Sequence, residues 1–289
     1  MNQISPAPVD VCLDHAGFIV RDLDATCNLM AQLGFTQTVR AEHTRTNEQG
    51  LLVSAGSAQR SIMLGNGYIE VMQITDPLAG HQLALAPTAR FGLHVVAFGT
   101  PDAVACQQQC VHNGVAAGPV LYWARQVNEE GLRGLAQFAY FGSAWKPHDP
   151  SYLCWVEQRT PELLRSPALL RHDNRALGLA ELHYRGPRRQ ALPWIERLLA
   201  AGMRLACERG SGVELSLPNA CMQIDFDEGD NALLPSALVF DLSDCAWLRA
   251  RCAELGLQVR DQADGGFDLD LVQQLGMHCI FQPAQGRAR

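Results

Sequence analysis

The sequence predicts an α+β fold built from four copies of one small unit. In each copy a short apolar segment is followed by a helical stretch that ends in glycine, and then by strand-like segments. This order recurs four times along the 289 residues. One such βαβββ unit cannot cover its own sheet, so the copies are expected to pair.

The first copy shows each of these elements. An apolar segment spans 13–20, and Leu23, Cys27, Met30 and Leu33 then follow at helical spacing. Gly34 stands where a left-handed residue would end that helix. Strand-like segments follow at 35–39, 50–54, 61–64 and 68–73.

The other three copies repeat the order. The second copy has strands at 91–98, 120–124, 136–141 and 152–156, and its helix ends at Gly114. The third copy begins with a strand at 177–184, and its helix ends at Gly202. The fourth copy begins with a strand at 237–242, has a helix that ends at Gly256, and closes with a strand at 276–282. The interval 160–175 is rich in loop-forming residues. We therefore predict two domains, 1–165 and 175–289, each of two paired copies.

Composition excludes several classes of partner. A net charge of -7 opposes nucleic-acid binding, and no apolar run approaches the length of a membrane-spanning helix. The first residues lack a basic region followed by an apolar one, so we expect a cytoplasmic protein. Its ten cysteines form no Cys-x-x-Cys pair and are expected to be reduced, packed thiols.

Three segments carry the residues that suggest a metal site. Residues 13–23 (LDHAGFIVRDL) and 92–99 (GLHVVAFG) each open a copy and place His15 and His94 at corresponding points. Residues 66–72 (NGYIEVM) close the first copy and contain Glu70. In module order over the whole chain, and in these motifs over its first part, the sequence resembles the vicinal oxygen chelate superfamily of glyoxalase-like, bleomycin-resistance and extradiol dioxygenase type.

The resemblance implies that paired modules curl into an incomplete barrel around a metal ion. His15 and His94 then correspond to the ligands of the opening strands, and Glu70 to that of the first closing strand. Aligning the second closing strand puts Cys154 at the fourth position, where Gln158, water or substrate are alternatives. Two imidazoles and a carboxylate suit Fe, Mn, Zn or Ni as the divalent ion. The second half offers no such set, since Leu179 and Ala237 stand where histidines would be needed.

Other polar and aromatic side chains are expected to bind substrate. They are Trp123, Arg125 and Tyr140 of the second copy, together with Gln158. The resemblance implies a metal-dependent enzyme acting on a small oxygenated molecule, as a lyase or isomerase or as a dioxygenase, whose catalytic residues the sequence does not reveal. The alternative is a metal-free protein that sequesters a small molecule, as resistance-type members do. In either case we expect a small molecule as the partner, and a homodimer is possible on this sequence.

Overall fold

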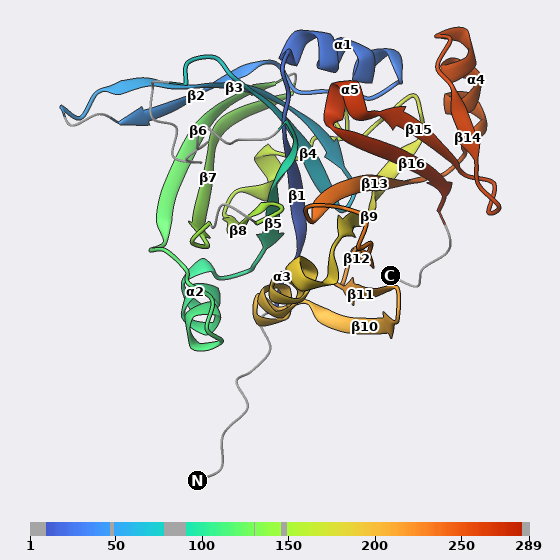
Figure 1. The fold of residues 1–289 in the computed structure, drawn as a ribbon. Helices are drawn as coiled ribbons and strands as arrows, with labels where there is room; N and C mark the ends of the chain where they lie inside the picture. The colour runs from blue at the N-terminus through green and yellow to red at the C-terminus, as the bar shows by residue number, and fades with distance from the viewer. Residues whose placement is uncertain (1–9, 47–48, 78–90, 130, 146–148, 285–289) are drawn as a thin grey trace. The chain divides into compact units, whose positions relative to one another are not determined.

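The computed structural model describes residues 10–46, 49–77, 91–129, 131–145 and 149–284 (Figure 1). Its first module comprises β1 (Cys12–Ile19), α1 (Leu23–Gln32), β2 (Ala41–Thr46), β3 (Leu52–Leu64) and β4 (Gly67–Ile74). The second comprises β5 (Gly92–Gly99), α2 (Ala103–His112), β6 (Leu121–Glu129), β7 (Leu132–Gly142) and β8 (Tyr152–Gln158), followed by the short η1 (Pro161–Leu163).

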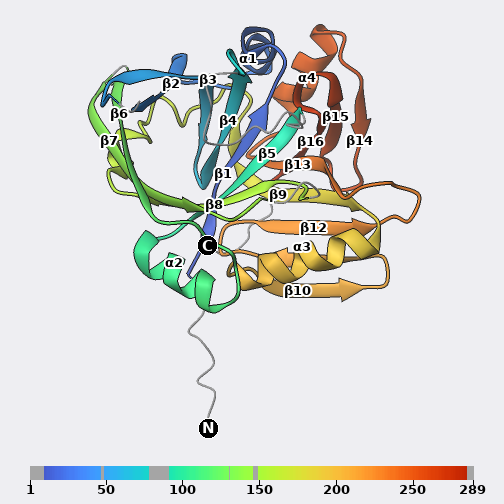
Figure 2. The ribbon, with the colours of Figure 1, turned by 60° about the vertical axis from the view of Figure 1, so that its left-hand side comes forward.

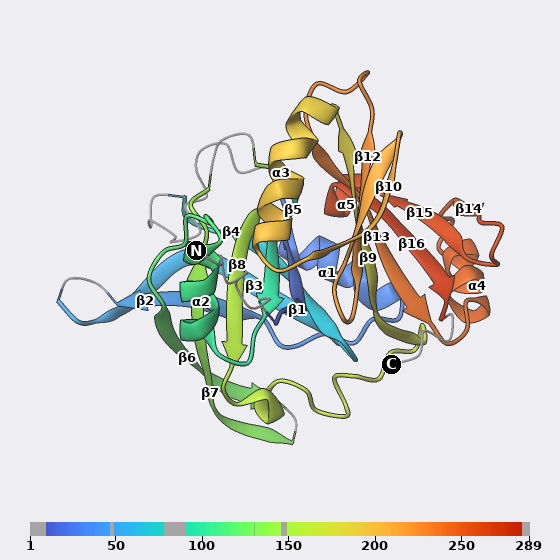
Figure 3. The ribbon, with the colours of Figure 1, turned by 90° about the horizontal axis from the view of Figure 1, so that it is seen from below.

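The second half repeats the pattern. The third module comprises β9 (Ala176–Gly186), α3 (Arg188–Ala200), β10 (Arg204–Arg209), β11 (Gly212–Ser216) and β12 (Cys221–Phe226). The fourth comprises β13 (Leu234–Leu242), α4 (Ala246–Glu254), β14 (Val259–Asp261), β15 (Phe267–Leu271), α5 (Val272–Leu275) and β16 (Met277–Pro283). Figure 2 shows α3 lying over β10 and β12, and Figure 3 shows α4 beside β14.

Each pair of modules forms one eight-stranded sheet. The strand orders are β2-β3-β4-β1-β5-β8-β7-β6 and β10-β11-β12-β9-β13-β16-β15-β14. In both sheets the opening strands of two modules are neighbours at the centre, and the hairpins lie at the edges. The predicted α+β class with paired βαβββ modules is therefore confirmed.

Packing divides the chain into two compact units. Unit 1 consists of Met1–His15, Val95–Leu164 and Ala180–Leu238, and unit 2 of Ala16–His94, Arg165–Leu179 and Val239–Arg289. Phe35, Phe240 and Phe281 form an aromatic core in unit 2, with the last two rings stacked 5.1 Å apart. The domain bounds 1–165 and 175–289 remain a prediction.

Two predicted elements of the first module differ from the structure. Residues 35–39 form no strand, although the amide of Thr38 donates to the Ser61 carbonyl at 2.9 Å. The two strands predicted at 50–54 and 61–64 are one long strand, β3, whose pairing with β2 is interrupted by a bulge. Gly56 lies in this bulge with a φ of +76°, a backbone conformation that residues other than glycine rarely adopt.

The ten cysteines are free thiols, most of them buried. No helix among the described residues is long and apolar enough to cross a membrane.

The segment between the second and third modules is held by buried side chains. His172 accepts from the Thr36 amide through Nδ1 at 3.0 Å and donates from Nε2 to the Met63 carbonyl at 2.8 Å. Asn174 is fully buried and donates to the Leu33 carbonyl at 2.9 Å. These bonds fix the segment against α1 and β3 within unit 2.

The two backbone partners of His172 require its neutral imidazole, which predicts a stability that depends on pH. Burial lowers the pKa of His172, and it outweighs the opposing hydrogen bond to Met63. The unfolded chain therefore binds the proton more tightly. Stability is complete above the unfolded pKa near 6.5 and is lost as pH falls toward the folded pKa, by up to about 1.4 kcal/mol per pH unit.

Urea unfolding at pH 7.5 and pH 5.5 measures this loss. The variant His172→Gln should be less stable at pH 7.5 and should lose less stability on acidification than the wild type. Equal losses in both proteins would show that another group causes the acid sensitivity.

Candidate functional site

The hairpin of the second module gathers the predicted substrate-binding residues on one sheet face. Strand register pairs Trp123 with Phe138, Arg125 with Ala136, and Phe138 with Gln158. Because directly paired and alternating residues share a face, one face of β6–β8 carries Trp123, Arg125, Tyr140, Cys154 and Gln158. We call this the Gln158 face.

The Gln158 face combines aromatic rings with groups that donate hydrogen bonds. Trp123 meets Tyr140 edge to face with ring centroids 5.3 Å apart, and Trp123 is 39% exposed. Burial, and to a smaller extent Cys154, raises the pKa of Tyr140 to about 12. Its hydroxyl therefore stays protonated at neutral pH and can donate to a substrate oxygen. The Arg125 guanidinium, half-buried on the same face, can bind a carboxylate.

The opposite face of β8 belongs to the core. Trp155 is fully buried and stacks on Phe141 at 4.8 Å, with Phe98 at 5.6 Å. Glu157 lies on this side and accepts from the amide of Ala103 at the start of α2 at 3.0 Å. Its carboxylate therefore accepts a hydrogen bond at the start of α2 and lies on the side of β8 opposite the Gln158 face.

His15 belongs to a buried chain of hydrogen bonds that reaches the Gln158 face. Its Nδ1 lies 2.8 Å from a carboxylate oxygen of Asp14, and the Gln158 amide donates to the same carboxylate at 3.1 Å. Asp14 and His15 are only 5% and 7% exposed. A Cβ added to Gly99 would lie 3.4 Å from that of Asp14, so Gly99 leaves room for the Asp14 side chain between β1 and β8.

His94 and Cys154 are also buried, but strand alternation separates them. Val95, Ala97 and Gly99 pair with Tyr152, Cys154 and Val156 and share the Gln158 face. His94 precedes Val95 in β5 and therefore alternates to the other face, that of Phe98.

Glu70 lies in unit 2, on the face of β3–β4 that also carries Ser61. Its Oε1 is 3.6 Å from Nε2 of His43, and Nδ1 of His43 is 2.8 Å from the hydroxyl of Ser57. The sequence offered no signal for His43 or Ser57, because they meet through the bulge of β3. Asp14 had one signal, its place directly before His15 in the first opening segment.

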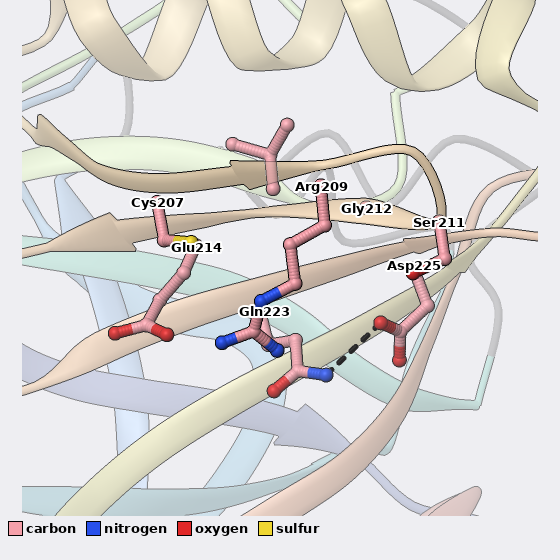
Figure 4. A pocket seen from close by; sticks show the side chains of 8 residues that line it. Cys207, Arg209, Ser211, Gly212, Glu214, Gln223 and Asp225 are labelled. Carbon is pink, nitrogen blue, oxygen red and sulfur yellow. Dashed lines mark hydrogen bonds between the residues drawn. The ribbon is translucent and has the colours of Figure 1, made fainter.

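The predicted ligands His15 and Cys154 lie in unit 1, and Glu70 and His94 lie in unit 2. Within the described ranges, no three His, Cys, Asp or Glu side chains lie close enough to hold a metal ion. His278 in the fourth module is bonded through Nδ1 to Asp268 at 3.0 Å. A pocket in β10–β12, where Gln223 donates to Asp225 at 2.9 Å (Figure 4), has a volume of about 30 Å³. It has room for a water molecule but not for a substrate.

Two sheets of paired βαβββ modules, with His15 buried in an opening strand, fit the glyoxalase-like class to which the family comparison assigns the chain. The family model of the glyoxalase-like domain matches residues 13–199, more than half of the chain. This chain belongs to that family, and its resemblance to the vicinal oxygen chelate superfamily is confirmed. A comparison with curated proteins finds no match.

Solved structures with the same fold come from several bacteria. A hypothetical protein from Staphylococcus aureus aligns over 95% of this chain and 100% of its own, with a TM-score of 0.65 and 12% identity. The Mn(II)-bound glyoxalase from Novosphingobium aromaticivorans aligns over 95% of this chain and 82% of its own, with a TM-score of 0.58 and 10% identity. A mutant of 4-hydroxymandelate synthase from Streptomyces coelicolor aligns over 97% of this chain and 94% of its own, with a TM-score of 0.57 and 14% identity. At these identities the likeness shows the fold alone.

Proposed function

We propose that this protein is a divalent-metal-dependent enzyme that acts on a small oxygenated substrate, as a lyase or isomerase or as a dioxygenase. One observation carries the proposal: the buried Asp14–His15 pair, held by Gln158. Histidines that ligate metals characteristically donate their other ring nitrogen to a carboxylate, which fixes the tautomer and makes the ligating nitrogen more basic. Donation from Nδ1 to Asp14 leaves the lone pair of His15 on Nε2.

The proposed ligands are His15 and Glu70, with His94 and Cys154 as further candidates. Imidazole and carboxylate donors suit Fe(II), Mn(II), Zn(II) or Ni(II). His15 fits a metal by its hydrogen bonding, and Glu70 fits by charge and partial burial, since its side chain is 16% exposed. Strand alternation puts His94 and Cys154 on opposite faces, so they are alternatives rather than joint ligands.

The bound ion would supply Lewis-acid chemistry to two neighbouring substrate oxygens. The chain's own residues would bind and orient the substrate. Tyr140 keeps its proton and donates a hydrogen bond, Arg125 binds an anionic group, and Trp123 covers an apolar part. Structural neighbours support the proposal, since one is a Mn(II)-bound glyoxalase and another a fusion with 4-hydroxyphenylpyruvate dioxygenase.

A metal-free binding protein is the second candidate. The arrangement of Trp123, Tyr140 and Arg125 on one face favours it, because aromatic rings and one cation can hold a small anionic molecule without a metal. The described residues also contain no three-donor group. Such a protein would bind its ligand equally well after removal of all metal.

Metal analysis separates the two candidates. Protein stripped with a chelator and reloaded with Mn(II), Fe(II), Zn(II) or Ni(II) should retain about one ion per chain. His15→Ala should lose affinity by more than the roughly 10–100-fold that follows loss of a ligand's hydrogen-bond partner. Asp14→Asn should fall within that range. A wild type that retains none of these ions would leave the metal-free candidate.

A further inference from the structure

A hairpin loop of the third module contacts the beginning of β1, and both segments belong to unit 1. The loop, residues 217–220, joins the antiparallel strands β11 and β12. It is closed by a hydrogen bond of 2.8 Å from the Leu217 amide to the Ala220 carbonyl. The ring of Pro218 restricts the backbone directly before Asn219. A short, closed loop of this kind holds the Asn219 side chain in a defined place.

The side-chain amide of Asn219 binds both backbone groups of Leu13. Oδ1 accepts from the Leu13 amide and Nδ2 donates to the Leu13 carbonyl, each at 2.8 Å. One side chain thus makes the pair of bonds that a residue of a neighbouring strand would make. Leu13 is the second residue of β1 and is 2% exposed. Chain segments near a terminus are poorly ordered unless they are tied down, and this double bond ties the beginning of β1.

The clamp lies one residue before the Asp14–His15 pair. The Leu13 carbonyl and the Asp14 amide belong to one planar peptide group, so the bond from Asn219 fixes the plane from which Asp14 leaves. Gln158 separately holds the Asp14 carboxylate at 3.1 Å. Backbone and side chain of Asp14 are therefore fixed by different modules, and the carboxylate meets Nδ1 of His15 at 2.8 Å.

A second clamp of the same kind occurs within unit 2. Nδ2 of Asn66 donates to the Leu179 carbonyl at 2.6 Å, and Oδ1 accepts from the Leu179 amide at 2.8 Å. Asn66 lies shortly before β4, as Asn219 lies shortly before β12. The residue after Leu179 is Ala180, which has no polar side chain to orient. The clamp is therefore a device of the fold, and at Asn219 it is joined to a carboxylate–imidazole pair.

We propose that Asn219 is a positioning residue for His15. By fixing the peptide between Leu13 and Asp14, it keeps the Asp14 carboxylate in line with Nδ1 of His15. The imidazole then holds its proton on Nδ1 and presents the lone pair of Nε2. The inference rests on the proposed function, in which His15 binds the ion through Nε2. It gives the third module a part in a site whose predicted ligands all come from the first two modules.

Nitrogen-15 NMR of the histidine side chains tests this role on the full chain, stripped with a chelator, at pH 7.5. In the wild type His15 should hold one tautomer, with the proton on Nδ1, and His15→Gln identifies its signals by their loss. In Asn219→Ala the peptide before Asp14 can rotate, so His15 should show a mixture of both tautomers. Affinity for Mn(II) should fall by up to about tenfold, because the ligand is less well oriented.

Asn66→Ala is the matched control, since it removes an equivalent pair of bonds from unit 2. Urea unfolding should show a loss of stability similar to that of Asn219→Ala, while the His15 signals stay as in the wild type. If Asn219→Ala does not fold, Asn219→Asp provides the same comparison. That variant keeps the size of the side chain and the acceptor for the Leu13 amide, but it lacks the donor to the Leu13 carbonyl.

Each outcome decides the assignment. Unchanged His15 signals in Asn219→Ala or Asn219→Asp would overturn the positioning role and leave the proposed function standing. An equal change in Asn66→Ala would also overturn it, because the effect would then follow from general loss of stability. A wild type that binds no divalent metal, but whose single His15 tautomer is lost in Asn219→Ala, would overturn the proposed function and support the role of Asn219.

Discussion

Replacing Glu70 by alanine is expected to remove most of the bound divalent metal. Glu70 is the only carboxylate among the predicted ligands, so its loss leaves the ion with no anionic oxygen from the protein. Its side chain is mostly buried beside His43, and removal of one carboxylate at that position should leave the fold intact. Elemental analysis of the purified variant measures the effect, and circular dichroism checks the fold.

The matched control is His278→Ala in the fourth module. His278 is bonded to Asp268 at 3.0 Å, and its side chain is 37% exposed. Its loss should change metal content little. Metal lost from His278→Ala but retained in Glu70→Ala would mean that the active site lies in the other half of the chain.

Replacing Trp155 by alanine should cause a large loss of stability, about 3–5 kcal/mol. Trp155 is fully buried between Phe141 and Phe98 on the helix-covered face of β8. Its deletion would leave a cavity lined by rings that pack too tightly to collapse into it. Urea unfolding at pH 7.5 measures the change.

Trp123→Ala provides the comparison. This tryptophan is 39% exposed on the Gln158 face, so its loss should cost at most about 1.5 kcal/mol of stability. It should weaken ligand binding if that face holds substrate. Equal destabilisation by both substitutions would contradict the division of β6–β8 into a buried core face and the Gln158 face.

Local chemistry explains why much of the fold could be predicted. Asp22 accepts from the Ala25 amide at 2.9 Å and begins α1, and Gly34 follows the helix with a φ of +81°. Both signals are readable within a few residues. The same start and stop recur at Asp102 and Gly114, so the repeat was visible without knowledge of tertiary contacts.

The features that the sequence patterns did not predict depend on contacts between residues far apart in the sequence. Residues 35–39 resemble a strand, but the amide of Thr36 is bound by His172 and its hydroxyl by the Arg171 carbonyl, more than a hundred residues away. His43 meets Glu70 only because β3 bulges at Gly56. A motif can place a histidine in a strand, but it cannot fix the face. His94 shows this, because one residue of register moves it away from the Gln158 face.

An anomalous difference map from crystals grown with Mn(II) tests the central claim most directly. The account predicts a peak within about 2.0–2.3 Å of Nε2 of His15 and of a Glu70 carboxylate oxygen. A peak at the His278–Asp268 pair, or none in protein soaked to saturation, would contradict it.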